Sequence, residues 1–135
     1  MLEIDRGFFD EMVEHGLAGF PNEACGLLAG KEGRPVKFFP MRNADASPAT
    51  FRLDSKEQLQ VEDEIDAEGW EVLAIFHTHT HSEAFPSATD RAKAAPWFTY
   101  LSHLVLSLSD RANPVLRAFR IAEDGEVSEE DLVVA

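Results

Sequence analysis

The stretch from Trp70 to Asp90 constrains the fold most, because an apolar segment there runs directly into three alternating histidines. The segment "WEVLAIF" (70–76) is apolar and contains β-branched residues, so it predicts a buried, central β-strand. If the chain stays extended beyond Phe76, the side chains at 77, 79 and 81 point to the same side. Imidazoles at two such positions can approach one cation, so this strand end is a candidate metal site.

Ser87 and Asp90 follow the histidines in an S-x-x-D pattern that has two compatible interpretations. The pattern is the signature of a helix capping box, in which Ser87 caps the helix and Asp90 reaches back. A catalytic zinc ion takes three protein ligands and keeps a fourth position for water, so two histidines are one ligand short. A helix that begins at Ser87 would hold Asp90 near the strand end as the nearest third ligand. A histidine-rich loop can equally be a solvated turn.

The remaining pattern mixes helices and strands along 135 residues, a length that suits one domain spanning 1–135. Apolar residues at helical spacing predict a helix from Asp5 to about Ala18, with Asp5 as its N-cap. A second helix begins at Asp54 or Ser55 and ends at Gly69. Strands are expected at 23–30, 34–40, 51–54, 102–110 and 114–124, a loop at 41–50, a short helix at 88–94 and a further short strand in the tail. The fold class is therefore α/β, with a sheet flanked by helices.

The charge balance and the apolar content exclude several classes of function. The chain has 25 acidic against 12 basic residues and a formal net charge of −13, so no nucleic-acid partner is expected. The acidity favours either a self-repelling, soluble surface or a face for a basic partner. No apolar run is long enough for a membrane span, and the acidic start lacks the features of a signal peptide. We therefore expect a cytoplasmic protein that does not bind a membrane.

Cys25 is the single cysteine, so the chain cannot form an internal disulfide. With His15 or His103 as its base, this thiol could be interpreted as a protease nucleophile. Cys25 lies in the apolar run "EACGLLAG", however, and this setting favours a small buried core residue.

Five residues together resemble the JAMM motif of the MPN family of metal-dependent hydrolases: Glu23, His77, His79, Ser87 and Asp90. The family pattern is a glutamate, then H-x-H, then about seven residues, then S-x-x-D. The segments "PNEACGLLAG", "RNADASPATFRLD" and "VLRAFRI" are similar to a small stand-alone bacterial branch of the family. The resemblance implies a single MPN domain, cytidine-deaminase-like, with a mixed and mostly antiparallel β-sheet flanked by helices.

The resemblance also implies a role for each motif residue. His77, His79 and Asp90 match the ligands of one Zn²⁺ ion per chain. Glu23 matches the general base, which takes a proton from the bound water and passes it to the leaving amine. Ser87 matches the residue that hydrogen-bonds the developing oxyanion or the bound water.

A third histidine creates a second possible register for the motif. Many family members have proline after the second histidine, where this chain has Thr80 and then His81. The pair His79-x-His81 also fits H-x-H, but only His79 is followed by seven residues before Ser87. The spacing therefore favours His77 and His79 as the ligands, and leaves His81 as a polar loop residue at the cleft mouth or a substrate contact.

The bacterial branch that this chain resembles acts on ubiquitin-like sulfur-carrier proteins with a Gly-Gly C-terminus. The resemblance implies hydrolysis of the bond after the C-terminal glycine, for example with release of cysteine during cysteine biosynthesis. A general deubiquitinase-like peptidase or dipeptidase is an alternative, and a metal-free MPN scaffold is a less favoured one because every motif position is intact. A homodimer is compatible with the sequence.

Further side chains are candidates for substrate contacts, each with an ordinary alternative. Three arginines lie in or near loops expected around the cleft: Arg42, Arg52 and Arg91. Arginine suits a substrate carboxylate, but surface arginines also balance an acidic protein. Three aromatic residues could line a groove for an extended peptide tail: Phe85, Trp97 and Tyr100. Aromatic residues more often pack in the core, so this groove is a hypothesis.

Overall fold

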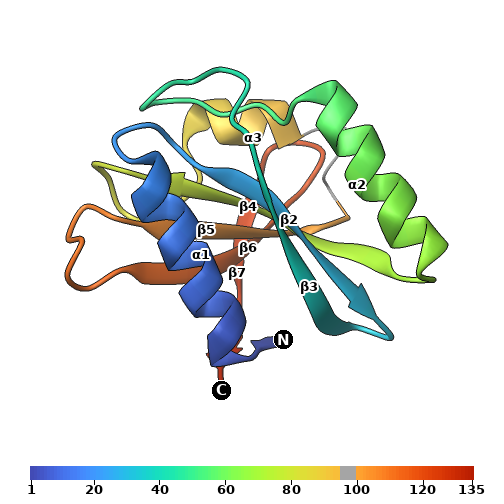
Figure 1. The fold of residues 1–135 in the computed structure, drawn as a ribbon. Coiled ribbons are helices and arrows are strands. Elements are labelled where there is room, and N and C mark those ends of the chain that lie inside the picture. The colour runs from blue at the N-terminus through green and yellow to red at the C-terminus, as the bar shows by residue number, and fades with distance from the viewer. Residues whose placement is uncertain (95–99) are drawn as a thin grey trace.

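The computed structural model describes residues 1–94 and 100–135 and is built around a six-stranded β-sheet (Figure 1). The strand order is β3-β2-β4-β5-β6-β7. These strands are β2 (Cys25–Lys31), β3 (Arg34–Met41), β4 (Glu71–His79), β5 (Ser102–Ser107), β6 (Val115–Ile121) and β7 (Val127–Glu130). β4 and β5 pair in parallel and the other neighbours pair antiparallel, which confirms the expected mixed, mostly antiparallel sheet.

The helices of the described chain are α1 (Arg6–Gly19), α2 (Ser55–Ala67) and α3 (Ala88–Ala94). α1 and α2 pack on opposite faces of the sheet. Adjacent residues of β4 point to opposite sides, so neighbouring residues of this strand pack toward different helices. Phe76 joins a buried cluster with Met12 of α1, whereas Ile75 joins a second cluster with Ile65 of α2. In the described part of the chain, no helix is both long and apolar enough to cross a membrane.

The strand β4 carries both motif histidines to the α2 side of the sheet. The sequence predicts a strand that ends at Phe76, but β4 continues to His79, so the histidines belong to the strand itself. His77 and His79 alternate with Thr78 and therefore share the face of Ile75. α3 lies in the connection between the parallel strands β4 and β5, the kind of crossover that a parallel pair requires.

The helix boundaries follow the expected signals. Asp54 is the N-cap of α2, and its carboxylate accepts a hydrogen bond from the backbone N–H of Glu57. Gly69 follows the helix with a φ of +74°, a conformation that glycine adopts without a side-chain penalty. Asp5 occupies the N-cap position of α1 as predicted, although its side chain makes no capping hydrogen bond.

The two ends of the chain form a second, two-stranded sheet. β1 (Leu2–Ile4) pairs in parallel with β8 (Leu132–Val134), and Figure 1 shows the two termini side by side. Leu2 and Ile4 are buried in the same cluster as Met12 of α1. Strands of three residues are too short to show a period of two, so the sequence predicts only a further strand in the tail and nothing at residues 2–4.

The prediction of a strand at 51–54 is wrong, because this segment contains only an isolated bridge between Leu53 and Asn43. Asn43 explains the difference. Its Oδ1 accepts hydrogen bonds from the backbone N–H groups of Asp45 and Arg52. The segment is therefore held against the preceding loop instead of extending the sheet.

Candidate metal centre

Three buried side chains meet at the end of β4, and they are the predicted metal ligands. His77 and His79 come from β4, and Asp90 comes from the first turn of α3. The Nε2 atoms of the two histidines lie 3.2 Å apart, and each lies 3.0 Å from Oδ2 of Asp90. The ligand atoms that this group offers all lie within 4.8 Å of one another.

This spacing fits a tetrahedral metal ion. Ligand atoms that are about 2.0–2.1 Å from zinc lie roughly 3.3 Å from one another, close to the separations seen between His77, His79 and Asp90. Two imidazole nitrogens and one carboxylate oxygen are also a donor set that zinc accepts, with the fourth position left for water. The geometry therefore brings together three ligands of the right type at the right separation.

The ring of His79 is oriented by a hydrogen bond on its far side. Its Nδ1–H donates to the backbone carbonyl of Glu83 at 2.9 Å. In the neutral form of the ring, a proton on Nδ1 leaves Nε2 unprotonated, and this tautomer is the one that ligates a metal through Nε2. In the metal-free protein, a protonated Nε2 can instead donate to Asp90. His77 differs, because its Nδ1 is buried and has no hydrogen-bond partner among the described residues.

The buried carboxylate of Asp90 and the imidazoles of His77 and His79 shift one another's pKa values. Burial alone would raise the pKa of Asp90, but hydrogen bonds from His77 and His79 hold this pKa well below its usual range. Burial lowers the pKa of His77 despite the neighbouring carboxylate. Burial acts in the same direction on His79, but the contacts with Asp90 and the Glu83 carbonyl outweigh it and raise this pKa. An ionised Asp90 beside a neutral His77 is the protonation state that metal binding requires.

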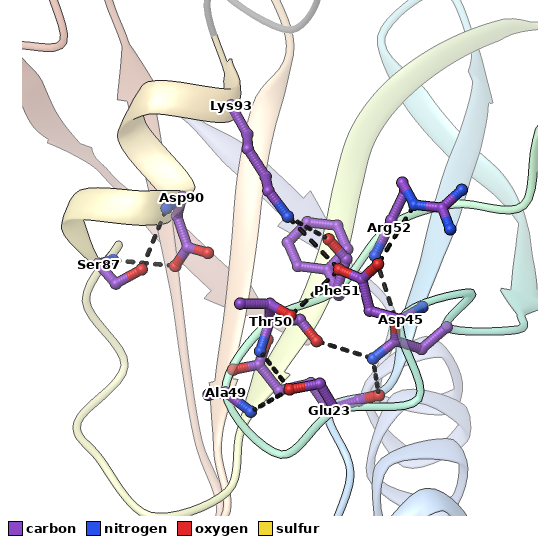
Figure 2. A network of polar contacts seen from close by, with 11 residues as sticks. Glu23, Asp45, Ala49, Thr50, Phe51, Arg52, Ser87, Asp90 and Lys93 are labelled. Atoms are coloured by element: carbon purple, nitrogen blue, oxygen red, sulfur yellow. Dashed lines mark hydrogen bonds and ion pairs between the residues drawn. The ribbon is translucent and has the colours of Figure 1, made fainter.

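Ser87 and Asp90 form the capping box that their spacing predicts. The backbone N–H of Asp90 donates to Oγ of Ser87 at 3.0 Å, and the backbone N–H of Ser87 donates to Oδ2 of Asp90 at 2.9 Å (Figure 2). The same Oδ2 faces His77 and His79. The capping box is therefore confirmed, and the same carboxylate lies where the predicted third ligand would have to be.

Glu23 lies just before β2 with its carboxyl group buried, only 5% of the residue being exposed. Its Oε1 has no hydrogen-bond partner within the described chain. Burial, reinforced by the charge of Asp90 and opposed by His79 and Lys93, raises the pKa of Glu23 from 4.5 to about 7. A carboxyl group with this pKa can take up and release a proton near neutral pH.

Thr78, between the two histidines, ties the Glu23 segment to the metal site. The backbone N–H of Ala24 donates to Oγ1 of Thr78 at 2.8 Å, and the N–H of Thr78 donates to the Ala24 carbonyl at 3.0 Å. Thr78 is fully buried. The middle residue of H-x-H thus anchors the segment that carries the predicted base, a contact that the sequence did not indicate.

A cavity of about 670 Å³ opens beside the three ligands, between α2, α3 and the sheet. Its lining includes His77 and Asp90, and also two of the predicted contact residues, Arg52 and Tyr100. Two residues that the sequence did not single out, Phe51 and Lys93, line it as well. A substrate segment in this cavity would therefore lie against aromatic and cationic side chains next to the metal ligands.

Arg42, Phe85 and Arg91 are not among the described residues that line this cavity. Arg42 is exposed and pairs with Asp54 at 2.9 Å. Phe85 packs edge-to-face on Phe119, with ring centroids 5.3 Å apart. The structure thus gives Arg42 an ion pair and Phe85 a packing contact, and Trp97 lies outside the described residues.

His81 is exposed and does not join the cluster of ligands. Its Nδ1 lies 2.9 Å from Oγ1 of Thr80, and its ring lies against that of Phe20, with centroids 5.7 Å apart. The structure therefore brings together His77 and His79, the register that the distance to Ser87 favours.

Cys25 is a free, fully buried thiol, as its apolar setting indicates. Burial raises the pKa of this thiol to about 12, so it is protonated at neutral pH and is a poor nucleophile. His15, one of the two bases considered for it, contacts the backbone carbonyls of Cys25 and Met41 with its Nε2 at 2.9 and 3.2 Å. The thiol-protease interpretation is therefore not supported.

Comparison with known proteins assigns the class of protein. The family model of prokaryotic homologs of the JAB domain matches residues 5–122. A CysO-cysteine peptidase of Mycobacterium tuberculosis is 40% identical over 136 residues, covering 99% of this chain and 91% of that protein. A desampylase of Pyrococcus furiosus is 33% identical over 112 residues, covering 83% and 76%. A solution structure of a protein from Desulfitobacterium hafniense matches with a TM-score of 0.88 and 34% identity, covering 100% and 93%.

The fold and the site define a metallopeptidase of the JAMM/MPN class. The chain belongs to the family of prokaryotic homologs of the JAB domain, whose model spans most of its length. The resemblance inferred from the motif residues is confirmed, and the chain is an enzyme of the hydrolase class.

Proposed function

We propose that this enzyme is a zinc-dependent hydrolase that cleaves the bond after the C-terminal glycine of a ubiquitin-like sulfur-carrier protein, for example releasing cysteine. The observation that carries the proposal is the convergence of His77, His79 and Asp90 near the buried carboxyl group of Glu23, whose Oε1 has no hydrogen-bond partner among the described residues. The substrate class is supported by the CysO-cysteine peptidase, which aligns with nearly the whole of both chains.

In this proposal His77, His79 and Asp90 hold one zinc ion. A zinc ion held there would supply the chemistry of an activated water near neutral pH and of a polarised substrate carbonyl. Glu23 accepts a proton at its carboxylate and returns it to the leaving amine, a task that suits a pKa of about 7. The backbone constraint from Thr78 keeps this carboxylate beside the strand that carries the histidines.

Ser87 is proposed to stabilise the negative charge that develops on the carbonyl oxygen. Its Oγ already accepts the backbone N–H of Asp90, so its own hydroxyl proton is free to be donated. Loss of a donor of this kind typically costs on the order of 10²–10³ in rate. The capping role uses the hydroxyl oxygen as an acceptor, and the catalytic role uses the hydroxyl proton as a donor, so the two roles do not compete.

The carrier is proposed to present its Gly-Gly tail in extended form along the cavity beside His77. A tail without side chains can pass close to the backbone and the metal ligands. Phe51 and Tyr100 offer apolar surface to such a tail, and Arg52 and Lys93 offer donors for its carbonyl oxygens. The folded part of the carrier would remain outside the cavity.

The test is to incubate the zinc-loaded enzyme with a carrier that ends in Gly-Gly-Cys and to follow the intact carrier by mass spectrometry. The expected result is loss of one cysteine residue from the carrier. The same carrier joined through its C-terminus to a lysine side chain, and a free Gly-Cys dipeptide, are the comparison substrates.

Each substrate discriminates one alternative. Faster cleavage of the lysine-linked conjugate would indicate a deubiquitinase-like peptidase, and cleavage of the dipeptide alone would indicate a dipeptidase. The matched control is Glu23→Gln, which should keep zinc and leave the carrier mass unchanged. A wild-type enzyme that binds no zinc and cleaves none of the substrates would instead support a scaffold.

A further inference from the structure

The two histidine ligands are supported in different ways on the side that faces away from Asp90. His79 donates its Nδ1–H to the carbonyl of Glu83. His77 is just as buried, yet among the described residues its Nδ1 has no hydrogen-bond partner. A metal-ligating histidine almost always uses its second nitrogen to fix the orientation of its ring. Among the described residues, a contact of another kind is therefore needed to orient the ring of His77.

The contact on the ring of His77 is the aromatic face of Phe51. The two rings are stacked, with centroids 4.4 Å apart and an angle of 15° between their planes. Rotation of the imidazole about its χ2 bond would drive the edge of the ring into this face. Stacking can therefore restrict the orientation of His77 without a hydrogen bond.

Phe51 is in turn held by the helix that supplies the third ligand. Lys93 lies three residues after Asp90 on α3, so the two side chains lie on neighbouring positions of one helix face. Its Nζ donates to the backbone carbonyl of Phe51 at 3.2 Å and lies 3.5 Å from Oδ2 of Asp45 (Figure 2). The placement of Phe51 is thus linked to α3.

The loop that carries Phe51 is stiffened at its other contacts. Asp45 accepts a hydrogen bond from Oγ1 of Thr50 at 3.1 Å and pairs with Nε of Arg52 at 3.2 Å. Asn43 joins the same loop to the Glu23 segment, because its Nδ2 donates to the carbonyls of Glu23 and Thr50. Figure 2 shows this network running from Glu23 to Lys93, beside α3 with Ser87 and Asp90.

We propose that Phe51 is a positioning residue for the metal ligand His77, in place of a hydrogen-bond acceptor, and that Lys93 keeps Phe51 in this position. The inference rests on the metal site of the proposed function and adds a residue outside the motif to it.

The experiment measures the zinc affinity of metal-free protein by competition with a chromophoric chelator. Phe51→Leu keeps an apolar side chain but removes the planar face, and it should weaken zinc binding on the order of tenfold. Phe51→Tyr keeps the face and should bind zinc within about twofold of the wild type. The absorption spectrum of the Co²⁺-substituted protein should change for Phe51→Leu and not for Phe51→Tyr.

The matched control is Phe39→Leu. Phe39 is buried in the core cluster against which Phe51 packs, but it lies on β3 and is not among the described cavity-lining residues. It should lower the free energy of unfolding and leave the zinc affinity unchanged. Equal zinc affinity in the wild type and Phe51→Leu would overturn the proposal, as would an equal loss in Phe39→Leu.

A double-variant cycle tests the part assigned to Lys93. Lys93→Met should weaken zinc binding in the wild type, but it should have little further effect when combined with Phe51→Leu. Additive losses in the double variant would show that Lys93 acts on the metal independently of Phe51 and would contradict the proposed link. A wild type that binds no zinc would instead refute the proposed function, so the two failures are distinguishable.

Discussion

Replacing Glu23 with glutamine should change how the stability of the metal-free protein depends on pH. In the folded protein, burial raises the pKa of Glu23 from 4.5 to about 7. The folded state therefore holds this proton more tightly than the unfolded chain does. The resulting contribution to stability is fully present below the unfolded pKa of 4.5 and is lost as the pH rises through about 7.

The size of the effect follows from these two pKa values. Between about pH 5.5 and about pH 8.5, the wild type should lose about 2 kcal/mol of unfolding free energy through Glu23 alone. Glutamine does not titrate, so the unfolding free energy of Glu23→Gln should not fall in this way. Burying the glutamine amide can also cost free energy. This cost would lower the unfolding free energy of Glu23→Gln by the same amount at every pH, so it would not change how the difference between the two proteins depends on pH.

The assay is urea denaturation of both proteins in the presence of a chelator at several pH values. The unfolding free energy of Glu23→Gln minus that of the wild type should rise by about 2 kcal/mol across the range, because Glu23 is the titrating group that the substitution removes. Glu14→Gln, at an exposed position of α1, is the control and should show no such rise. A difference that stays constant with pH would refute the argument that burial raises the pKa of Glu23 in the folded protein.

Other variants test separate parts of the site. His77→Ala should lose stoichiometric zinc, measured by elemental analysis, because it removes one of three ligands. Zinc at about a hundredfold excess over its Kd should raise the unfolding free energy of the wild type by roughly 2.7 kcal/mol and should not stabilise His77→Ala. Ser87→Ala should keep zinc but lose about 1 kcal/mol of stability with its helix cap, and its turnover should fall on the order of 10²–10³. Tyr100→Ala should raise the KM for the carrier, whereas Phe85→Ala should not, since Tyr100 lines the cavity and Phe85 packs on Phe119. A zinc-replete His77→Ala, an unimpaired Ser87→Ala or a selective effect of Phe85→Ala would each contradict the assigned role.

The convergence of the three candidate metal ligands could be predicted because their placement depends on local periodicity. Strand geometry puts His77 and His79 on one side, and the capping pattern of Ser87 places Asp90 at the start of a helix. The choice of His79 over His81 came from the resemblance to the JAMM motif, in which about seven residues separate H-x-H from S-x-x-D. These local relations act over a few residues of sequence, and the resemblance to the JAMM motif added the roles of the five residues.

The contacts that support the ligands could not be predicted, because they depend on tertiary placement. Phe51 and His77 are far apart in the sequence, and their rings stack because residues 43–53 pack near α3. The role of Lys93 depends on its hydrogen bond to Phe51, which is also a tertiary contact. The burial that raises the pKa of Glu23 likewise comes from the assembled fold. Pairing of β1 with β8 joins the two ends of the chain, a distance that no local pattern spans.

The most direct test of the account is a zinc titration of the metal-free enzyme with a Gly-Gly-Cys carrier as substrate. The account predicts no loss of cysteine before zinc is added, and cleavage that rises in proportion to zinc and levels off at one ion per chain. Glu23→Gln should take up the same single ion and remain inactive. Cleavage by the metal-free wild type, or full zinc occupancy without cleavage of the carrier, would contradict the account.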